Sequence, residues 1–195
     1  MSLDYAAPAR NTTGGPLRLI VTACLCLAID LITKHLAAAH LLGSPVQFIP
    51  GWLDFTYVEN RGAVFGMGQG RQVLFICVSV IAVGFVIYLF TRPPRHWWYE
   101  ITLGMLLAGI LGNLYDRVVF GYVRDMIHAL PGFYWGGTWQ IPLLNYPPPP
   151  DRAYFPWVFN VADSLLCVSI AILLVTGLLT PDPKPDDAPT DTTRT

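Results

Sequence analysis

Four long apolar stretches, separated by polar connections, dominate the pattern along the chain. They lie at about 17–39, 73–91, 97–116 and 158–180. Each is long enough for a helix to cross the roughly 30 Å hydrocarbon core of a bilayer, because a helix rises about 1.5 Å per residue. The pattern therefore predicts an all-α membrane protein with four transmembrane helices.

Both ends of the chain are polar. Residues 1–16 include Pro8, Asn11 and two glycines, and residues 181–195 are rich in proline and aspartate. Segments of this composition lack the apolar surface that a packed core requires. We expect two disordered tails flanking a single four-helix domain at 17–180.

The distribution of lysine and arginine sets the expected orientation. Four spans place both termini on one side of the membrane, and the twelve cations divide six against six between the two sides. Positive charge counts most in short connections, and the connection carrying Arg92 and Arg95 is short and lies on the side of the termini. We therefore expect both tails in the cytoplasm and two long extracytoplasmic connections, at about 39–72 and 117–157.

The two long connections differ in character. In the first, residues 47–57 are rich in Val, Phe, Ile, Trp and Tyr around a Pro50-Gly51 turn, which predicts a small β-hairpin on the outer membrane surface. The second connection is a long extracytoplasmic loop that holds an aromatic and proline-rich insertion at about 131–157. The insertion is either an interfacial belt of aromatic side chains or a lid over a bound substrate.

Composition narrows the possible functions. Apolar residues make up 53% of the chain, charged residues only 13%, and the formal net charge is -1, so no positive field exists to attract nucleic acid. The four cysteines all lie inside apolar stretches, which indicates small buried or lipid-facing side chains. Residues 21–24 resemble a lipobox, but the apolar stretch continues past Cys24, unlike a cleaved signal segment.

Ionisable residues near the ends of the spans are the candidates for a functional role. Placing one such side chain inside a membrane span costs at least about 2.5–3.5 kcal/mol on insertion scales, so each requires a partner or a function. Asp30 and Lys34 are four residues apart, so they lie on one helix face and can neutralise each other. Asp116 can form an ion pair with the adjacent Arg117. These four residues therefore have a structural explanation that requires no chemistry.

Asp125 and Asp163 have no neighbouring cation that obviously claims them, although Arg124 can neutralise Asp125. The loop between them leaves and re-enters on the same face, which allows the two carboxyls to meet. Two carboxyls within hydrogen-bond distance cannot both ionise, so one serves as an acid and the other as a base. Asn160 precedes Asp163 by three residues and can orient a carboxyl or hold a substrate carbonyl. This arrangement predicts aspartic-type peptide hydrolysis.

Two other classes of protein share some of these features. A proton-coupled transporter or channel subunit also carries acids within its spans, but its polar residues must continue across the membrane. Here the polar residues collect at one face, and Glu100 is the exception in the inner halves. A noncatalytic scaffold accounts for the glycines but not for two converging acids. The hydrolase interpretation therefore fits the residues best.

Four short motifs cover nearly all of the four-helix region. They are Asp30-x-x-Thr33-Lys34, Asn60-x-Gly62-Ala63-x-Phe65, Gly112-Asn113-x-x-Asp116-Arg117-x-x-x-Gly121-x-Val123-x-Asp125 and Phe159-Asn160-x-Ala162-Asp163-Ser164. In sequence and in order they resemble the motifs of the lipoprotein signal peptidases, or signal peptidase II, which are integral-membrane aspartic proteases of bacteria. Met126 departs from the family pattern, which usually has Phe there.

The resemblance implies an enzyme that removes the signal peptide from diacylglyceryl-modified prolipoproteins, cutting before the lipid-bearing cysteine at the outer face of the bacterial cytoplasmic (inner) membrane. It implies that Asp125 and Asp163 form the catalytic dyad, with no metal or other cofactor. We expect globomycin-type cyclic peptides as inhibitors, contact with membrane lipids, no nucleic-acid partner and a monomer. The residues implied to bind substrate or support the dyad are Asp30, Lys34, Asn60, Gly62, Asn113, Asp116, Arg117, Asn160 and Ala162.

Overall fold

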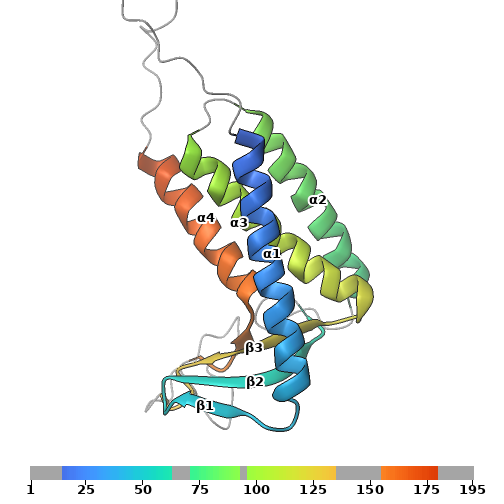
Figure 1. Cartoon of the computed structure of the whole chain (residues 1–195), viewed down its shortest axis with the longest axis vertical. Coiled ribbons are helices and arrows are strands. Elements are labelled where there is room, and N and C mark those ends of the chain that lie inside the picture. The colour runs from blue at the N-terminus through green and yellow to red at the C-terminus, as the bar shows by residue number, and fades with distance from the viewer. Residues whose placement is uncertain (1–14, 63–70, 93–95, 135–154, 180–195) are drawn as a thin grey trace, which may run out of the picture.

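The protein is a bundle of helices with a small sheet at one end (Figure 1). A computed structural model describes residues 15–62, 71–92, 96–134 and 155–179. The helices are α1 (Gly15–His40), α2 (Gln72–Thr91), α3 (Trp97–Val119) and α4 (Val161–Leu179). The strands are β1 (Val46–Ile49), β2 (Leu53–Asn60), β3 (Val123–Ala129) and β4 (Val158–Phe159).

Helix α3 is the centre of the bundle, since it packs against each of the other three helices. Glycines allow this close approach. A Cβ atom on Gly104 would lie 2.8 Å from the carbonyl oxygen of Leu19 in α1, and one on Gly109 would lie 2.7 Å from that of Ala162 in α4. Small residues at helix contacts are the usual means of packing helices inside a membrane.

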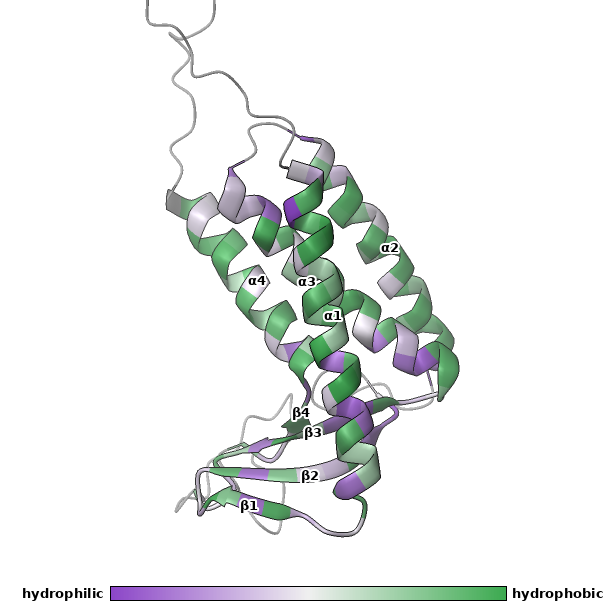
Figure 2. Ribbon diagram, viewed as in Figure 1, coloured by the Kyte–Doolittle hydropathy of each residue, from purple (hydrophilic) through white to green (hydrophobic). Residues whose placement is uncertain are grey.

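Within the described residues, three helices are long and apolar enough to cross a membrane: α1, α2 and α4. Most of the residues along these three helices are hydrophobic (Figure 2). Helix α3 carries Glu100, Asp116 and Arg117, and its central position shields these side chains from lipid. The expected helical membrane fold with a small sheet is therefore confirmed, and the crossing by α3 stays a prediction.

The sheet is antiparallel, with strand order β1-β2-β3-β4. The hairpin expected at 47–57 is present as β1 and β2, which join through a turn where Gly51 has a φ of +76°. Strands β3 and β4 were not predicted. Val158 and Phe159 were assigned to the fourth span, but they pair with His128 and Ile127 of β3, so α4 begins at Val161.

Several predictions fall on residues outside the described ranges. They concern nearly all of the first tail, the whole of the second tail and most of the aromatic insertion, at 1–14, 180–195 and 135–154. The same holds for Ala63 and Phe65 of the second motif.

Candidate active site

Asp125 and Asp163 meet where the sheet joins the bundle. Asp125 lies in β3 and is 1% exposed, and Asp163 lies in the first turn of α4. The side chain of Asn160 connects them. Its Nδ2 donates a hydrogen bond to Oδ1 of Asp125 over 2.6 Å, and its Oδ1 accepts one from the backbone N–H of Asp163 over 2.9 Å. One amide group therefore contacts both of the predicted catalytic residues.

Asn160 also starts helix α4. In return for the bond to its Oδ1, Asp163 accepts a hydrogen bond at Oδ2 from the backbone N–H of Asn160, over 3.3 Å. Such a reciprocal pair of side chains satisfies two backbone donors that the first turn of a helix leaves without partners. The start of the helix thus fixes the conformation of the Asp163 carboxylate.

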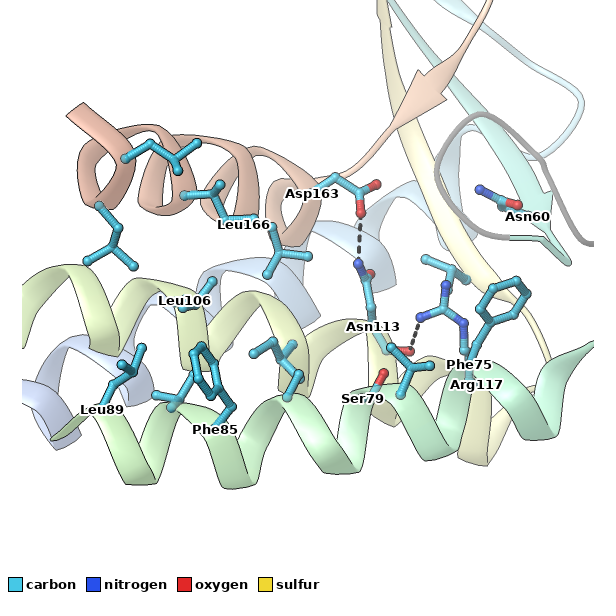
Figure 3. A pocket seen from close by; sticks show the side chains of 18 residues that line it. Asn60, Phe75, Ser79, Phe85, Leu89, Leu106, Asn113, Arg117, Asp163 and Leu166 are labelled. Atoms are coloured by element: carbon cyan, nitrogen blue, oxygen red, sulfur yellow. Dashed lines mark hydrogen bonds between the residues drawn. The ribbon is translucent and has the colours of Figure 1, made fainter. Parts of the chain in front are cut away.

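Two further asparagines donate to the carboxyls. Asn113 of α3 donates from Nδ2 to Oδ1 of Asp163 over 2.7 Å (Figure 3). Asn60, at the end of β2, donates from Nδ2 to Oδ2 of Asp125 over 2.9 Å. The Oδ1 atom of Asn60 accepts a hydrogen bond from the N–H of Gly62, also over 2.9 Å. This bond determines that the Nδ2 end of the amide, and not its oxygen, faces Asp125. Each carboxyl therefore accepts hydrogen bonds from more than one part of the chain.

The environment of Asp125 favours its protonated form. Burial raises the pKa of Asp125 most, and the nearby charge of Asp163 raises it further, to about 7. Hydrogen bonds from Asn60 and Asn160 act in the opposite direction. This carboxyl therefore keeps its proton to a much higher pH than an ordinary aspartate, as an acid catalyst requires.

A buried cluster of four charged residues lies beside the dyad. Nζ of Lys34 is 2.9 Å from Oδ2 of Asp30 and 3.5 Å from Oδ2 of Asp116. Oδ1 of Asp116 is 2.7 Å from Nη2 of Arg124. Two acids and two cations balance, so the cluster as a whole is neutral.

Two expected pairings differ in the structure. Asp116 contacts Lys34 and Arg124 rather than its neighbour Arg117. Because its guanidinium group binds Asp116, Arg124 does not neutralise Asp125, and that alternative is wrong. No local pattern indicates this pairing, because a turn through Gly121 brings the two partners together across the end of α3.

Arg117 instead supports the chain that enters the site from β2. Its guanidinium donates to the carbonyl oxygen of Gly62 over 3.3 Å and to that of Asn113 over 3.4 Å, and it lies over the ring of Phe75 in α2. Ala162, another motif residue, contributes its backbone N–H, which donates to Oδ1 of Asp30 over 2.8 Å. The nine residues implied to bind substrate or support the dyad therefore all lie in or beside this network.

A cavity of about 520 Å³ runs from Asp163 along the bundle between α2, α3 and α4 (Figure 3). Four polar residues surround its end near the sheet: Asn60, Asn113, Arg117 and Asp163. Apart from Ser79, the rest of the wall is apolar and includes Phe85, Leu89 and Leu106. This shape suits a long apolar ligand with one polar group at its end. Within the described ranges, no group of three or more His, Cys, Asp or Glu residues can hold a metal.

Solved structures share this fold. A bacterial membrane enzyme structure obtained by the in meso method at 2.3 Å resolution has a TM-score of 0.67 and 24% identity, over 91% of this chain and 93% of that chain. A second, at 1.9 Å resolution, has a TM-score of 0.65 and 27% identity, over 84% and 94% of the two chains. The fold and the buried polar site thus define a membrane enzyme.

Sequence comparisons identify the family. The family model described as signal peptidase (SPase) II matches residues 22–179. A lipoprotein signal peptidase of Caldanaerobacter subterraneus subsp. tengcongensis is 40% identical over 79% of this chain and 91% of its own length. One from Streptococcus pyogenes serotype M1 is 33% identical over 80% and 90% of the two chains. The chain belongs to the signal peptidase II family, and it is a bacterial membrane peptidase of lipoprotein processing.

Proposed function

We propose that the protein is an aspartic endopeptidase that removes the signal peptide from diacylglyceryl-modified prolipoproteins by cutting before the lipid-modified cysteine. The observation that carries this proposal is the pair Asp125 and Asp163, joined by Asn160 at the polar end of an apolar cavity. Family membership supports the substrate class.

A count of charges supports a dyad with one proton. The neighbouring cluster, which includes Lys34, is neutral as a whole, and outside this cluster the charge of Arg117 acts on both Asp125 and Asp163. With both carboxyls ionised, these three groups carry one excess negative charge. One proton on the dyad removes this excess, which is costly in a buried site.

The two carboxyls then have different roles. The Asp163 carboxylate takes a proton from a water molecule while the water oxygen adds to the carbonyl carbon of the scissile peptide bond. Protonated Asp125 donates its proton to the carbonyl oxygen as the tetrahedral intermediate forms. When the carbon–nitrogen bond breaks, the proton on Asp163 moves to the leaving nitrogen and Asp125 recovers its proton from the collapsing diol. No cofactor takes part.

The cavity offers a place for the apolar part of the substrate. A signal peptide and the acyl chains of a diacylglyceryl group are both apolar, and the wall beyond the polar end is lined by residues such as Val78, Phe85 and Leu106. We place the scissile bond at Asp163 and the apolar substrate segment along this wall. A globomycin-type cyclic peptide is expected to compete for the same space.

The proposed topology follows from the two ends of the bundle. Helix α3 also crosses the membrane, which gives four crossings in total. Residues 17–180 form one catalytic domain, and both tails lie in the cytoplasm. Arg92 ends α2 at the end of the bundle opposite the sheet, which suits the cytoplasmic side. The dyad then lies near the outer face of the membrane, where a lipid-modified precursor is accessible. We propose that the enzyme acts as a monomer in the bacterial cytoplasmic membrane.

Single replacement of either dyad residue tests the mechanism. Asp125→Asn and Asp163→Asn keep the shape of the side chain but cannot share a proton as two carboxyls do. We expect each purified, folded variant to leave a lipidated precursor uncut in a gel assay, with turnover reduced by about 10³-fold or more relative to wild type. Normal processing by either variant would refute the dyad, and proton flux through reconstituted protein would favour a transporter.

A further inference from the structure

One polar side chain in the cavity wall stands apart from the polar end. Ser79 of α2 lines the cavity, and among the described residues of the wall it is the polar residue outside the group near the sheet. Figure 3 shows its side chain on the face of α2 that borders the cavity. The hydroxyl group of Ser79 therefore faces the space that the proposed function assigns to the substrate.

The Ser79 hydroxyl is not used by its own helix. Elsewhere in the bundle, Thr102 donates to the carbonyl oxygen of Trp98 over 2.8 Å, and Thr176 donates to that of Ile172 over 2.7 Å. A bond to the carbonyl four residues earlier is a common way to satisfy a hydroxyl inside a helix. In the part of the chain that the structure describes, the Ser79 hydroxyl makes no hydrogen bond. Its proton is therefore available to a bound ligand.

Ser79 lies at the border between the polar end and the apolar wall. One turn earlier on α2, the centroid of the Phe75 ring is 5.3 Å from the guanidinium carbon of Arg117. Four residues of helix correspond to a rise of about 6 Å, so Ser79 is one turn further from the sheet than this contact. Beyond Ser79, the residues of α2 that line the cavity are all apolar: Ala82, Phe85, Val86 and Leu89. A ligand group that binds Ser79 therefore lies between a polar segment and an apolar one.

The proposed substrate carries a polar group at this border. In a diacylglyceryl-modified cysteine, two ester groups join the glyceryl unit to the acyl chains, a few bonds beyond the cysteine sulfur. With the scissile bond at Asp163 and the acyl chains along the apolar wall, the esters lie at the level of Ser79. An ester carbonyl that moves from the membrane surface into an apolar cavity loses its hydrogen bonds to water. A hydroxyl donor in the wall replaces one of these bonds.

We propose that Ser79 is a specificity-determining residue, whose hydroxyl donates a hydrogen bond to one ester carbonyl of the substrate's diacylglyceryl group. This inference rests on the proposed function of the same cavity. The ester does not change during cleavage of the peptide bond, so the hydrogen bond is equally strong in the bound substrate and in the transition state. Uniform binding of this kind lowers KM and leaves kcat unchanged.

Two precursors that differ only in the ester carbonyls test the proposal. One carries the diacylglyceryl group, and the other carries a dialkylglyceryl group, in which ether links replace the esters. Wild type and Ser79→Ala cleave both precursors in the same detergent. We expect KM of wild type to be about three- to tenfold lower for the ester precursor, as the loss of one neutral hydrogen bond predicts. In Ser79→Ala the ratio of the two KM values should fall by the same factor, with kcat within about twofold of wild type.

Ser169 of α4 supplies the matched control. Its side chain is fully buried, its Oγ has no hydrogen-bond partner among the described residues, and it does not line the cavity. Ser169→Ala therefore removes a similar hydroxyl from the bundle without changing the cavity wall. We expect its ratio of KM values to match wild type. If the ratio falls equally in both serine variants, the effect belongs to the bundle as a whole and the proposal is overturned.

The remaining outcomes separate this inference from the proposed function. If Ser79→Ala keeps the wild-type ratio of KM values, the hydroxyl does not bind an ester carbonyl. A rise in KM by the same factor for both precursors also refutes the ester contact, and places a carbonyl of the signal peptide at Ser79 instead. If folded wild type cleaves neither precursor, the proposed function itself fails. Thermal unfolding without substrate should show that Ser79→Ala is as stable as wild type, because its hydroxyl has no partner to lose and alanine favours helix.

Discussion

The contact between α1 and α3 carries charge at both of its ends, and the two ends differ in burial. At one end, Arg18 is 43% exposed where it pairs with Glu100. At the other, the side chains of Asp30, Lys34 and Asp116 are all 0% exposed. The pair of Arg18 with the buried Glu100 is partly exposed, so water competes for Arg18 and weakens the interaction. A charge that loses its partner where every member is buried is severely destabilised. The same helix pair therefore has an end that tolerates change and an end that does not.

Removing one member of the buried cluster should have the largest effect on stability. Lys34→Met removes the ion-pair partner of Asp30 and leaves Asp116 with Arg124, so we expect a loss of about 3–5 kcal/mol in the free energy of unfolding. Arg18→Gln should cost less, because Arg18 is 43% exposed and its pair with Glu100 is only partly removed from water. Thermal unfolding of both variants in the same detergent measures the difference, and equal losses would contradict the comparison.

Close packing around the cluster can be broken without removing a charge. A Cβ atom at Gly112 would collide with Oδ2 of Asp30, so Gly112→Ala should destabilise the protein by about 1–3 kcal/mol and reduce cleavage. Gly84 of α2 is the matched control, because a Cβ there meets nothing within 4 Å. Gly84→Ala should leave stability unchanged or raise it slightly, since alanine favours helix. Equal unfolding temperatures for the two variants would exclude this account.

The dyad is a third kind of charged site. Here a proton, and not a neighbouring cation, neutralises one of the two carboxyl groups. The raised pKa of Asp125, about 7 against an ordinary 3.8, means that the folded protein binds this proton more tightly than the unfolded chain does. The stabilisation that comes from binding this proton is therefore complete below about pH 4 and is lost as the pH rises through about 7. Asp125→Asn should remove this loss and be more stable than wild type at pH 8, by on the order of 1 kcal/mol. Unfolding curves at pH 5 and pH 8 test the sign.

The sequence predicted those parts of the molecule that depend on local pattern. Long apolar stretches identified the helices, and Pro50-Gly51 between two β-forming runs identified the hairpin. The spacing of Asp30 and Lys34 predicted their ion pair, because residues four apart share a helix face. In each case the partners lie close together along the chain.

What the sequence did not predict depends on contacts between distant segments. Val158 and Phe159 continue the apolar character of α4, and only their pairing with β3 makes them a strand. Asp116 has an arginine beside it in sequence, yet it pairs with Arg124 because the turn after α3 brings β3 back over the helix. The shared contact of Asn160 with both aspartates also requires β3 and α4 to meet.

Asn160 has two structural roles, and this restricts which substitutions the protein can accept at that position. The same side chain starts α4 and contacts both acids, so a substitution there would disturb the start of the helix and the dyad at the same time. Because Asn160 is 0% exposed and does not line the cavity, resistance to an inhibitor that occupies the cavity would have to arise at other residues.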